Sequence, residues 1–275
     1  MAPRWGLYSE LHPDELEAIV AASPVVYIPW GALEWHGAHL PLGLDGLVAE
    51  EVCRRAAAIS GGVVLPTTWW AITTLPHRFS LTTPDGLIVE LWRDLFRRLA
   101  GVGFRVIVVI TGHYAQAHDM LLMNAADAGM DETDALILAA PELAVLDETS
   151  RLDHAARWET SSLLAIRPDL VRLDRLDRET PEGATDLARF GVLGADPRST
   201  ATPAQGDAVL NAAASAWAGW ATELLAQPDA ARARAFHAQR RAAYQPYVER
   251  YYQGDWEDAL RAWWATRLGT TDEHT

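Results

Sequence analysis

A series of regularly spaced leucines followed directly by an apolar run is the strongest structural signal in this chain. Leu87, Leu91, Leu95 and Leu99 recur every fourth residue, with charged residues between them and a glycine at position 101. This spacing predicts an amphipathic helix from residue 85 to about residue 101. The next segment, residues 104–110, holds six apolar residues in seven. Such a run predicts a strand buried on both faces, as in a parallel sheet covered by helices.

The same alternation of strand and helix extends along the first half of the chain. Its patterns predict strands at residues 25–29, 63–66 and 135–139, and further helices at residues 46–60 and about 115–128. This order predicts an α/β fold, a three-layer α/β/α sandwich with a mostly parallel central sheet. Polar residues that follow the strands are then expected at the carboxyl edge of the sheet.

The second half of the chain has a less regular pattern. It predicts a loop to about Asp153, a helix from Thr160, a turn-rich stretch over residues 178–206, and helices from residue 208 onward, punctuated by Pro246 and Gly254. We expect one domain over residues 1–275, with residues 216–275 as a C-terminal helical extension packed on it. The tryptophans near the end predict a docked helix, with a subunit interface as the alternative.

Composition excludes several classes of function. The formal net charge of −14 disfavours nucleic acid and anionic membranes as partners. All 23 basic residues are arginines, so a lysine nucleophile is excluded, and the single cysteine, Cys53, leaves no disulfide or thiolate metal cluster. No apolar run approaches the roughly 20 residues that cross a bilayer, and the first ten residues lack the features of a secretory signal. We therefore expect a cytoplasmic protein.

Four ligand-type side chains are predicted to meet at the carboxyl edge of the sheet. Glu34 and His36 lie two residues apart, so in an extended backbone their side chains point to the same side, and Asp45 returns to them after one loop. His113 follows a neighbouring predicted strand. Each alone has an ordinary explanation, as a hydrogen-bonded core histidine or a helix N-cap. Together they predict a metal site, because Zn²⁺ and Mn²⁺ prefer imidazole nitrogen and carboxylate oxygen.

The segment that contains three of these residues resembles the first motif of the creatininase family of metal-dependent amidohydrolases. The positions in register with that motif are Pro29, Gly31, Glu34, His36, Gly37, His39, Leu40, Pro41, Leu42 and Asp45. Residues 111–113, Thr-Gly-His, resemble the family's Asn-Gly-His motif, and His154 with residues 159–161, Glu-Thr-Ser, resembles its third motif. The later turn over residues 191–197 is also similar. The resemblance extends over about residues 25 to 215.

The resemblance implies a centre of two divalent ions per chain, zinc, manganese or iron. It implies that Glu34 and His113 bind one ion, that His36 binds the other, and that Asp45 bridges them. Creatininase itself has a metal-binding glutamate two residues after the family histidine, where this chain has Ala115. Glu159 is the natural replacement in other branches of the family. Its alternative is an acidic residue at a helix N-terminus, stabilised by the helix dipole.

Further residues are candidates for roles around this centre. His154 is the candidate catalytic acid or a substrate clamp, with a loop histidine bonded to a neighbour such as Asp153 as the alternative. The candidates for substrate binding are Tyr114, His77 and Trp158. His39 is expected to brace the ligand loop by hydrogen bonds, and His118 and His237 are expected to be ordinary helix residues. Trp35, Trp69, Trp70 and Trp158 are packing residues or an aromatic wall for a flat substrate.

The activity that the resemblance implies is hydrolysis of a non-peptide, cyclic amide or formamide C–N bond of a small molecule by a metal-bridged hydroxide. Ala115 argues against creatinine as the substrate. Thr111 and Trp35, which also depart from the family motifs, leave open a catalytically silent protein that binds metal or ligand. No nucleic acid or membrane partner is expected. A homo-oligomer is expected, because the resemblance implies the hexamer of the family. Motifs of serine hydrolases and dinucleotide-binding proteins are missing.

Overall fold

The computed structural model describes residues 4–146, 151–181 and 186–269. Its centre is a sheet of five strands that are all parallel, in the order β1-β3-β2-β4-β5. The strands are β1 (Trp5–Leu7), β2 (Val25–Trp30), β3 (Gly62–Val64), β4 (Val106–Thr111) and β5 (Leu136–Pro141). All residues of β2 and β4 are buried, as the apolar runs predict.

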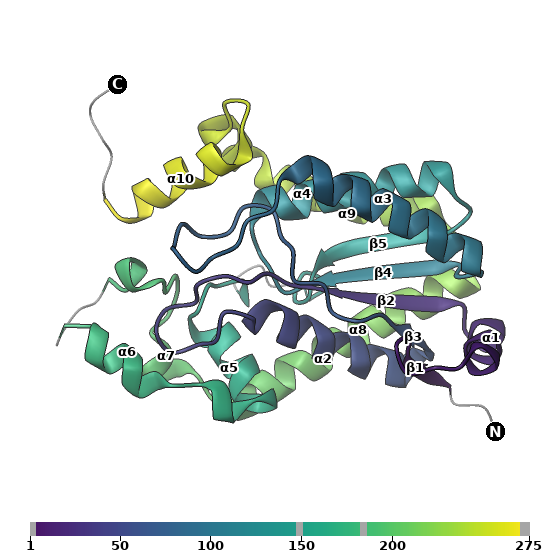
Figure 1. Ribbon diagram of the computed structural model, residues 1–275, viewed down its shortest axis with the longest axis horizontal. Coiled ribbons are helices and arrows are strands. Elements are labelled where there is room, and N and C mark those ends of the chain that lie inside the picture. Colours follow the sequence, from purple (N-terminus) through teal and green to yellow (C-terminus); the bar gives the residue numbers. More distant parts are fainter. Residues whose placement is uncertain (1–3, 147–150, 182–185, 270–275) are drawn as a thin grey trace.

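Helices cover both faces of the sheet (Figure 1). One face carries α3 (Asp85–Val102) and α4 (Gln116–Glu132), with α9 (Ala230–Tyr251) packed along the edge strand β5. The other face carries α2 (Leu44–Ser60), α5 (Arg157–Ile166) and α8 (Pro203–Ala226). The predicted three-layer α/β/α fold is therefore confirmed, with a sheet that is parallel throughout. No helix within the described ranges is long and apolar enough to span a membrane.

The shorter elements surround these layers. They are α1 (Pro13–Ala22), the 3₁₀ turns Pro168–Leu170 and Ala188–Phe190, α6 (Leu173–Glu179), α7 (Pro197–Thr200) and α10 (Trp256–Arg267). Figure 1 shows α10 beyond the ends of β4 and β5, far from the N-terminal helix α1. The sequence patterns did not predict β1 or α1.

The buried face of α3 differs from the one that the leucine spacing predicts. The helix is present, but Leu87 is 66% exposed and Leu91 44% exposed. The residues buried against the core are instead Ile88, Trp92, Phe96 and Leu99. Both sets recur at helical spacing, and the set with the larger aromatic side chains fills the space above the sheet.

The later helices also differ from the predicted boundaries. Helix α5 begins at Arg157, three residues early, and α8 begins at Pro203, inside the stretch predicted to be turns. Pro246 lies within α9, at an exposed position where water can reach the carbonyl that proline leaves unpaired. Residues 147–150 of the predicted loop, 182–185 of the turn-rich stretch and 270–275 of the extension lie outside the described residues.

Candidate metal centre

The register of the sheet brings three strand ends to one level. Trp30 of β2 pairs with Thr111 of β4, and Thr111 pairs with Pro141 of β5. The residues that follow each strand therefore lie together at the carboxyl edge. They include the loop that carries Glu34, and His113.

Two glycines let the first turn of α2 rest directly on this edge. A Cβ atom on Gly31 would collide with the backbone of Gly46, and one on Gly112 would collide with the backbone of Asp45. Both glycines follow strand ends, so α2 begins against β2 and β4 without side chains between them. This close approach places the Asp45 carboxylate between the side chains that β2 and β4 deliver.

One group of possible metal ligands consists of Glu34, Asp45 and His113. The Nδ1 atom of His113 lies 3.0 Å from Glu34 Oε2 and 3.3 Å from Asp45 Oδ2. All three residues are buried. The other nitrogen of His113, Nε2, lies 3.0 Å from the carbonyl oxygen of Thr73 and donates to it, so Nδ1 is the nitrogen that could bind a cation.

A second group consists of His36, Asp45 and Glu159. The Nε2 atom of His36 lies 2.9 Å from Asp45 Oδ1 and 3.6 Å from Glu159 Oε2. His36 Nδ1 lies 3.0 Å from the carbonyl oxygen of Glu34, to which it donates. The two groups share Asp45, whose two oxygens face different histidines. This arrangement is that of two adjacent sites joined by one carboxylate.

The donor atoms fit divalent cations. His36 Nε2 and both Asp45 oxygens are buried and lack a hydrogen bond of acceptable geometry, and buried polar atoms without such bonds are costly. In the described part of the chain, the ion pairs of Glu34, Asp45 and Glu159 all run to histidines. Three carboxylates therefore face two imidazoles, a ligand set suited to Zn²⁺ or Mn²⁺.

The protonation equilibria of the two histidines respond to this excess of negative charge. Burial opposes a charged His36, but the carboxylates of Asp45 and Glu159 outweigh it and raise its pKa to about 10. For His113, burial is likewise outweighed by Glu34 and Asp45, which raise its pKa well above the usual value. Protons on these histidines therefore supply positive charge when no cation does.

The three carboxylates differ. Burial would raise the pKa of Glu34, and His113 reverses the effect and lowers it. Burial opposes ionisation of Asp45 too, but His36 and His113 hold its pKa below the usual range. Burial raises the pKa of Glu159 well above its usual value, and Asp45 adds to this effect. Glu159 is thus the carboxylate that the histidines compensate least.

Glu159 lies in the first turn of α5, as its alternative explanation required, but its side chain turns inward. Its Oε2 atom accepts a hydrogen bond of 2.5 Å from the amide of Ala155 and faces His36. Asp153 serves the helix end in its place, because its carboxylate accepts from the amides of Trp158 (2.8 Å) and Glu159 (3.3 Å).

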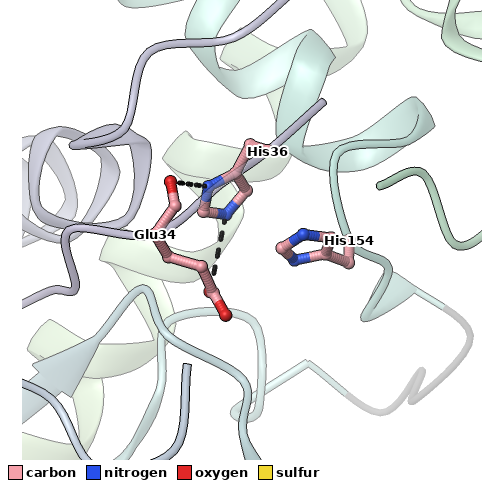
Figure 2. A group of neighbouring side chains, drawn as sticks. All are labelled: Glu34, His36 and His154. Atoms are coloured by element: carbon pink, nitrogen blue, oxygen red, sulfur yellow. Dashed lines mark hydrogen bonds and ion pairs between the residues drawn. The ribbon is translucent and has the colours of Figure 1, made fainter. Parts of the chain in front are cut away.

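His154 forms a third group of possible ligands with Glu34 and His36 (Figure 2). Its ring stacks on that of His36, with 4.3 Å between centroids. Its Nε2 atom lies 3.0 Å from the carbonyl oxygen of Trp35 and donates to it, so this nitrogen is bonded to Trp35 and not to the neighbouring Asp153. Burial and the nearby His36 lower the pKa of His154 to about 4. At neutral pH this imidazole is uncharged and can accept a proton on Nδ1.

A cavity of about 80 Å³ opens beside Glu34, His113 and His154. Its remaining walls come from Thr73, Leu75, Tyr114, Ala115, Leu193, Leu260 and Trp263. Tyr114, a candidate for substrate binding, therefore lines this cavity. His77 stacks on Trp35, with 4.5 Å between centroids, and lines a neighbouring cavity. Trp158 does not line this cavity; its ring lies beneath the guanidinium of Arg157.

His39 and His118 have structural partners. His39 Nε2 lies 3.0 Å from the carbonyl oxygen of Ala155 and 3.2 Å from Thr160 Oγ1, so it ties the ligand loop to the start of α5. His118, in α4, accepts a hydrogen bond of 3.2 Å from the amide of Ile72. The His39 contacts fit its expected bracing role, whereas His118, expected to be an ordinary helix residue, supports the backbone at Ile72.

Sequence reasoning missed one buried acid near the cavity. Glu142 directly follows β5 at the carboxyl edge, and its carboxylate accepts a hydrogen bond from the hydroxyl of Tyr114. Burial raises the pKa of Glu142 to about 8. Its position after a buried strand was an available signal, since Glu34 and His113 also follow strands. Leu260 and Trp263 carried no such signal.

Comparisons with known proteins agree with this geometry. A family model described as Creatininase: Creatinine amidohydrolase matches residues 9–220. Creatinine amidohydrolase of Pseudomonas putida is 30% identical over 219 residues, which cover 70% of this chain and 83% of that protein. Mycofactocin precursor peptide peptidase of Mycolicibacterium smegmatis is 29% identical over 211 residues, which cover 68% and 79%.

Solved structures show the same relationship. A crystal structure of creatinine amidohydrolase (creatininase) aligns with a TM-score of 0.68 at 25% identity, and covers 81% of this chain and 98% of that one. A structure described as creatininase Mn gives 0.67 at 25% identity, with 81% and 99% covered. The resemblance carried by the sequence motifs is confirmed, and the chain belongs to the creatininase family of amidohydrolases.

Proposed function

We propose that this protein is a metal-dependent amidohydrolase that cleaves a non-peptide, cyclic amide or formamide C–N bond of a small molecule. The observation that carries the proposal is the pair of ligand groups that share Asp45. Glu34 and His113 would hold one divalent ion, and His36 and Glu159 the other. The ions, zinc, manganese or iron, would polarise the amide carbonyl and lower the pKa of a bound water.

The chain's own residues would move the proton and orient the substrate. Neutral His154, held through its Nε2–H by the carbonyl of Trp35, can take a proton on Nδ1 and return it to the departing nitrogen. Tyr114 would contact the substrate, with its hydroxyl fixed by Glu142. His113 and His36 are held in one tautomer by backbone carbonyls, so their orientation does not depend on the substrate.

One departure from the family motif supports a substrate other than creatinine. Ala115 stands where creatininase has a metal-binding glutamate and places a methyl group in the cavity wall. One relative with similar identity is a peptidase that acts on a peptide precursor.

We also infer that residues 1–275 form one domain, because α10 packs on the cavity residue Leu75.

Elemental analysis of protein purified without chelator, combined with a panel of cyclic amides, formamides and short peptides, tests the proposal. We expect about two divalent ions per chain and turnover of a cyclic amide or a formamide on the panel, but not of a peptide. Asp45→Ala should lower turnover more than about a thousandfold, because it removes a ligand from both ions. The exposed Asp134→Ala is the matched control and should change neither value. Full activity in protein with almost no metal would overturn the proposal.

A second candidate is a catalytically silent relative that binds metal or ligand. The substitutions at Ala115, Thr111 and Trp35 favour it. It predicts metal retention without turnover on any amide, and a ligand affinity that His154→Ala leaves unchanged. Turnover that falls in His154→Ala while metal content stays constant would contradict it.

A further inference from the structure

We propose that the C-terminal helix α10 forms an apolar specificity wall of this site through Leu260 and Trp263, and that the substrate carries an apolar group beside the scissile amide. The inference rests on the proposed function and adds a substrate class to it. Both residues lie outside the family match, which ends at residue 220. They line the cavity that opens on Glu34, His113 and His154.

The cavity has two chemically different ends. The ligand-type end carries the carboxylate of Glu34 and the imidazoles of His113 and His154. The other end is formed by Leu75, Leu193, Leu260 and Trp263. An apolar substituent at that end would be stabilised by contact with these side chains.

Leu75 joins the two ends. Its backbone amide donates a hydrogen bond to Glu34 Oε1, and its side chain packs in a small cluster with Leu260 and Trp264. Trp263 and Leu193 are partly buried at the border of this cluster. The apolar wall therefore begins at a residue that contacts the proposed ligand Glu34 directly, close enough to contact a group attached to the reacting amide.

The position and size of the cavity explain how a substituent would reach this wall. At about 80 Å³, the cavity is smaller than an apolar protein cavity of roughly 150 Å³ that binds benzene. Part of a substituted amide must therefore lie at the rim. The rim carries the partly exposed ring of Trp263, on the helix that Figure 1 shows beyond the strand ends.

Two hydroxamates separate the metal centre from the wall. Acetohydroxamate and phenylacetohydroxamate share a head that chelates divalent cations and differ by one phenyl ring. With zinc-loaded protein in a calorimeter, we expect the phenyl compound to bind about tenfold more tightly. Trp263→Ala and Leu260→Ala should each reduce this ratio to about twofold or less and leave acetohydroxamate affinity unchanged. Trp263→Phe should keep most of the ratio.

Trp256→Ala is the matched control, because Trp256 lies on the same helix and packs against Tyr252 instead of lining the cavity. It should leave the ratio at its wild-type value, which separates the wall from general loosening of α10. A tenfold ratio retained in both Trp263→Ala and Leu260→Ala would overturn the inference alone. Failure of both hydroxamates to bind wild-type protein would overturn the proposed metal centre and the inference with it.

Discussion

Two buried clusters of ionisable groups in this protein balance charge in different ways. The edge cluster lies at the carboxyl edge of the sheet and consists of Glu34, His36, Asp45, His113 and Glu159. The helix cluster lies between α4 and α9 and consists of Asp119, Asp127, His237, Arg240, Arg241 and Tyr244. Both are almost free of solvent at their centres.

Each carboxylate of the helix cluster has an arginine of its own. Arg241 lies 2.8 Å from Asp127, and Arg240 lies 3.7 Å from Asp119. His237 donates from Nδ1 to Asp127 over 2.7 Å, while its Nε2 accepts from the backbone amide of Ala139 over 3.1 Å. Both nitrogens of this histidine are therefore used, and α9 satisfies an amide of the edge strand β5.

The comparison of His237 with His36 shows how the two clusters differ in the source of their positive charge. His36 also has one nitrogen bound to the backbone, but its second nitrogen faces carboxylates without a hydrogen bond. A structural cluster contains its own permanent cations, whereas the edge cluster depends on protons or on cations from outside. Metal binding at the edge should therefore displace protons from His36 and His113.

The largest expected effect tests whether the helix cluster is purely structural. Arg240→Ala leaves Asp119 buried without its arginine, which should lower the free energy of unfolding by about 4 kcal/mol. Metal content should not change. Urea unfolding and elemental analysis measure the two quantities. Arg97→Ala, which breaks an exposed pair with Asp94, is the control and should cost less than about 1 kcal/mol. Loss of metal in Arg240→Ala would show that the helix cluster also supports the edge cluster and is not purely structural.

A pH dependence should follow from Asp119. Burial raises its pKa to about 6, against the opposing effects of Arg240 and Tyr244. The folded state therefore binds the Asp119 proton more tightly than the unfolded state. The contribution of this proton to the free energy of unfolding is complete below about pH 4 and is lost as the pH rises to about 6. The decline should amount to about 3 kcal/mol.

Asp119→Asn removes this titration and keeps an acceptor for Tyr244. The difference between wild-type and variant unfolding free energies is measured from pH 4 to 7. It should change between about pH 4 and 6 and stay constant above about pH 6. A difference that stays constant from pH 4 to 7 would show that Asp119 is ionised in the folded state throughout.

The smallest expected effect concerns Glu159, the least compensated carboxylate of the edge cluster. Glu159→Gln should reduce metal content from about two ions per chain to about one. It should also stabilise the metal-free protein, because a carboxylate whose burial raises its pKa is replaced by a neutral amide. Glu142→Gln, a buried neighbour outside both ligand groups, is the matched control and should keep both ions. Two ions retained in Glu159→Gln would show that the Glu159 carboxylate is not a required metal ligand.

Local pattern predicted the parts of the fold that local pattern controls. The apolar run of β4 and the order of strands and helices were sufficient for the three layers. The buried face of α3 was not, because Leu91 and Trp92 both belong to helically spaced sets and only the sheet above which they lie decides between them. Strand β1 has three residues, too few to show a period.

The candidate site divides along the same line. Glu34, His36 and Asp45 are close in the sequence, and His113 follows a strand, so their meeting could be predicted from the parallel sheet. Glu159 was suggested only by family resemblance. Trp263 reaches the cavity because α10 docks there after two long helices, and no pattern around it records that contact.

The glycines beneath Asp45 limit how this centre could be rebuilt elsewhere. If the five side chains of the edge cluster were copied onto another parallel sheet, a Cβ at the positions of Gly31 or Gly112 would push the helix away and displace the Asp45 carboxylate. The set of positions that must be transferred is therefore seven, two of which have no side chain. Searches for such centres in other proteins should include those two bare positions among their criteria.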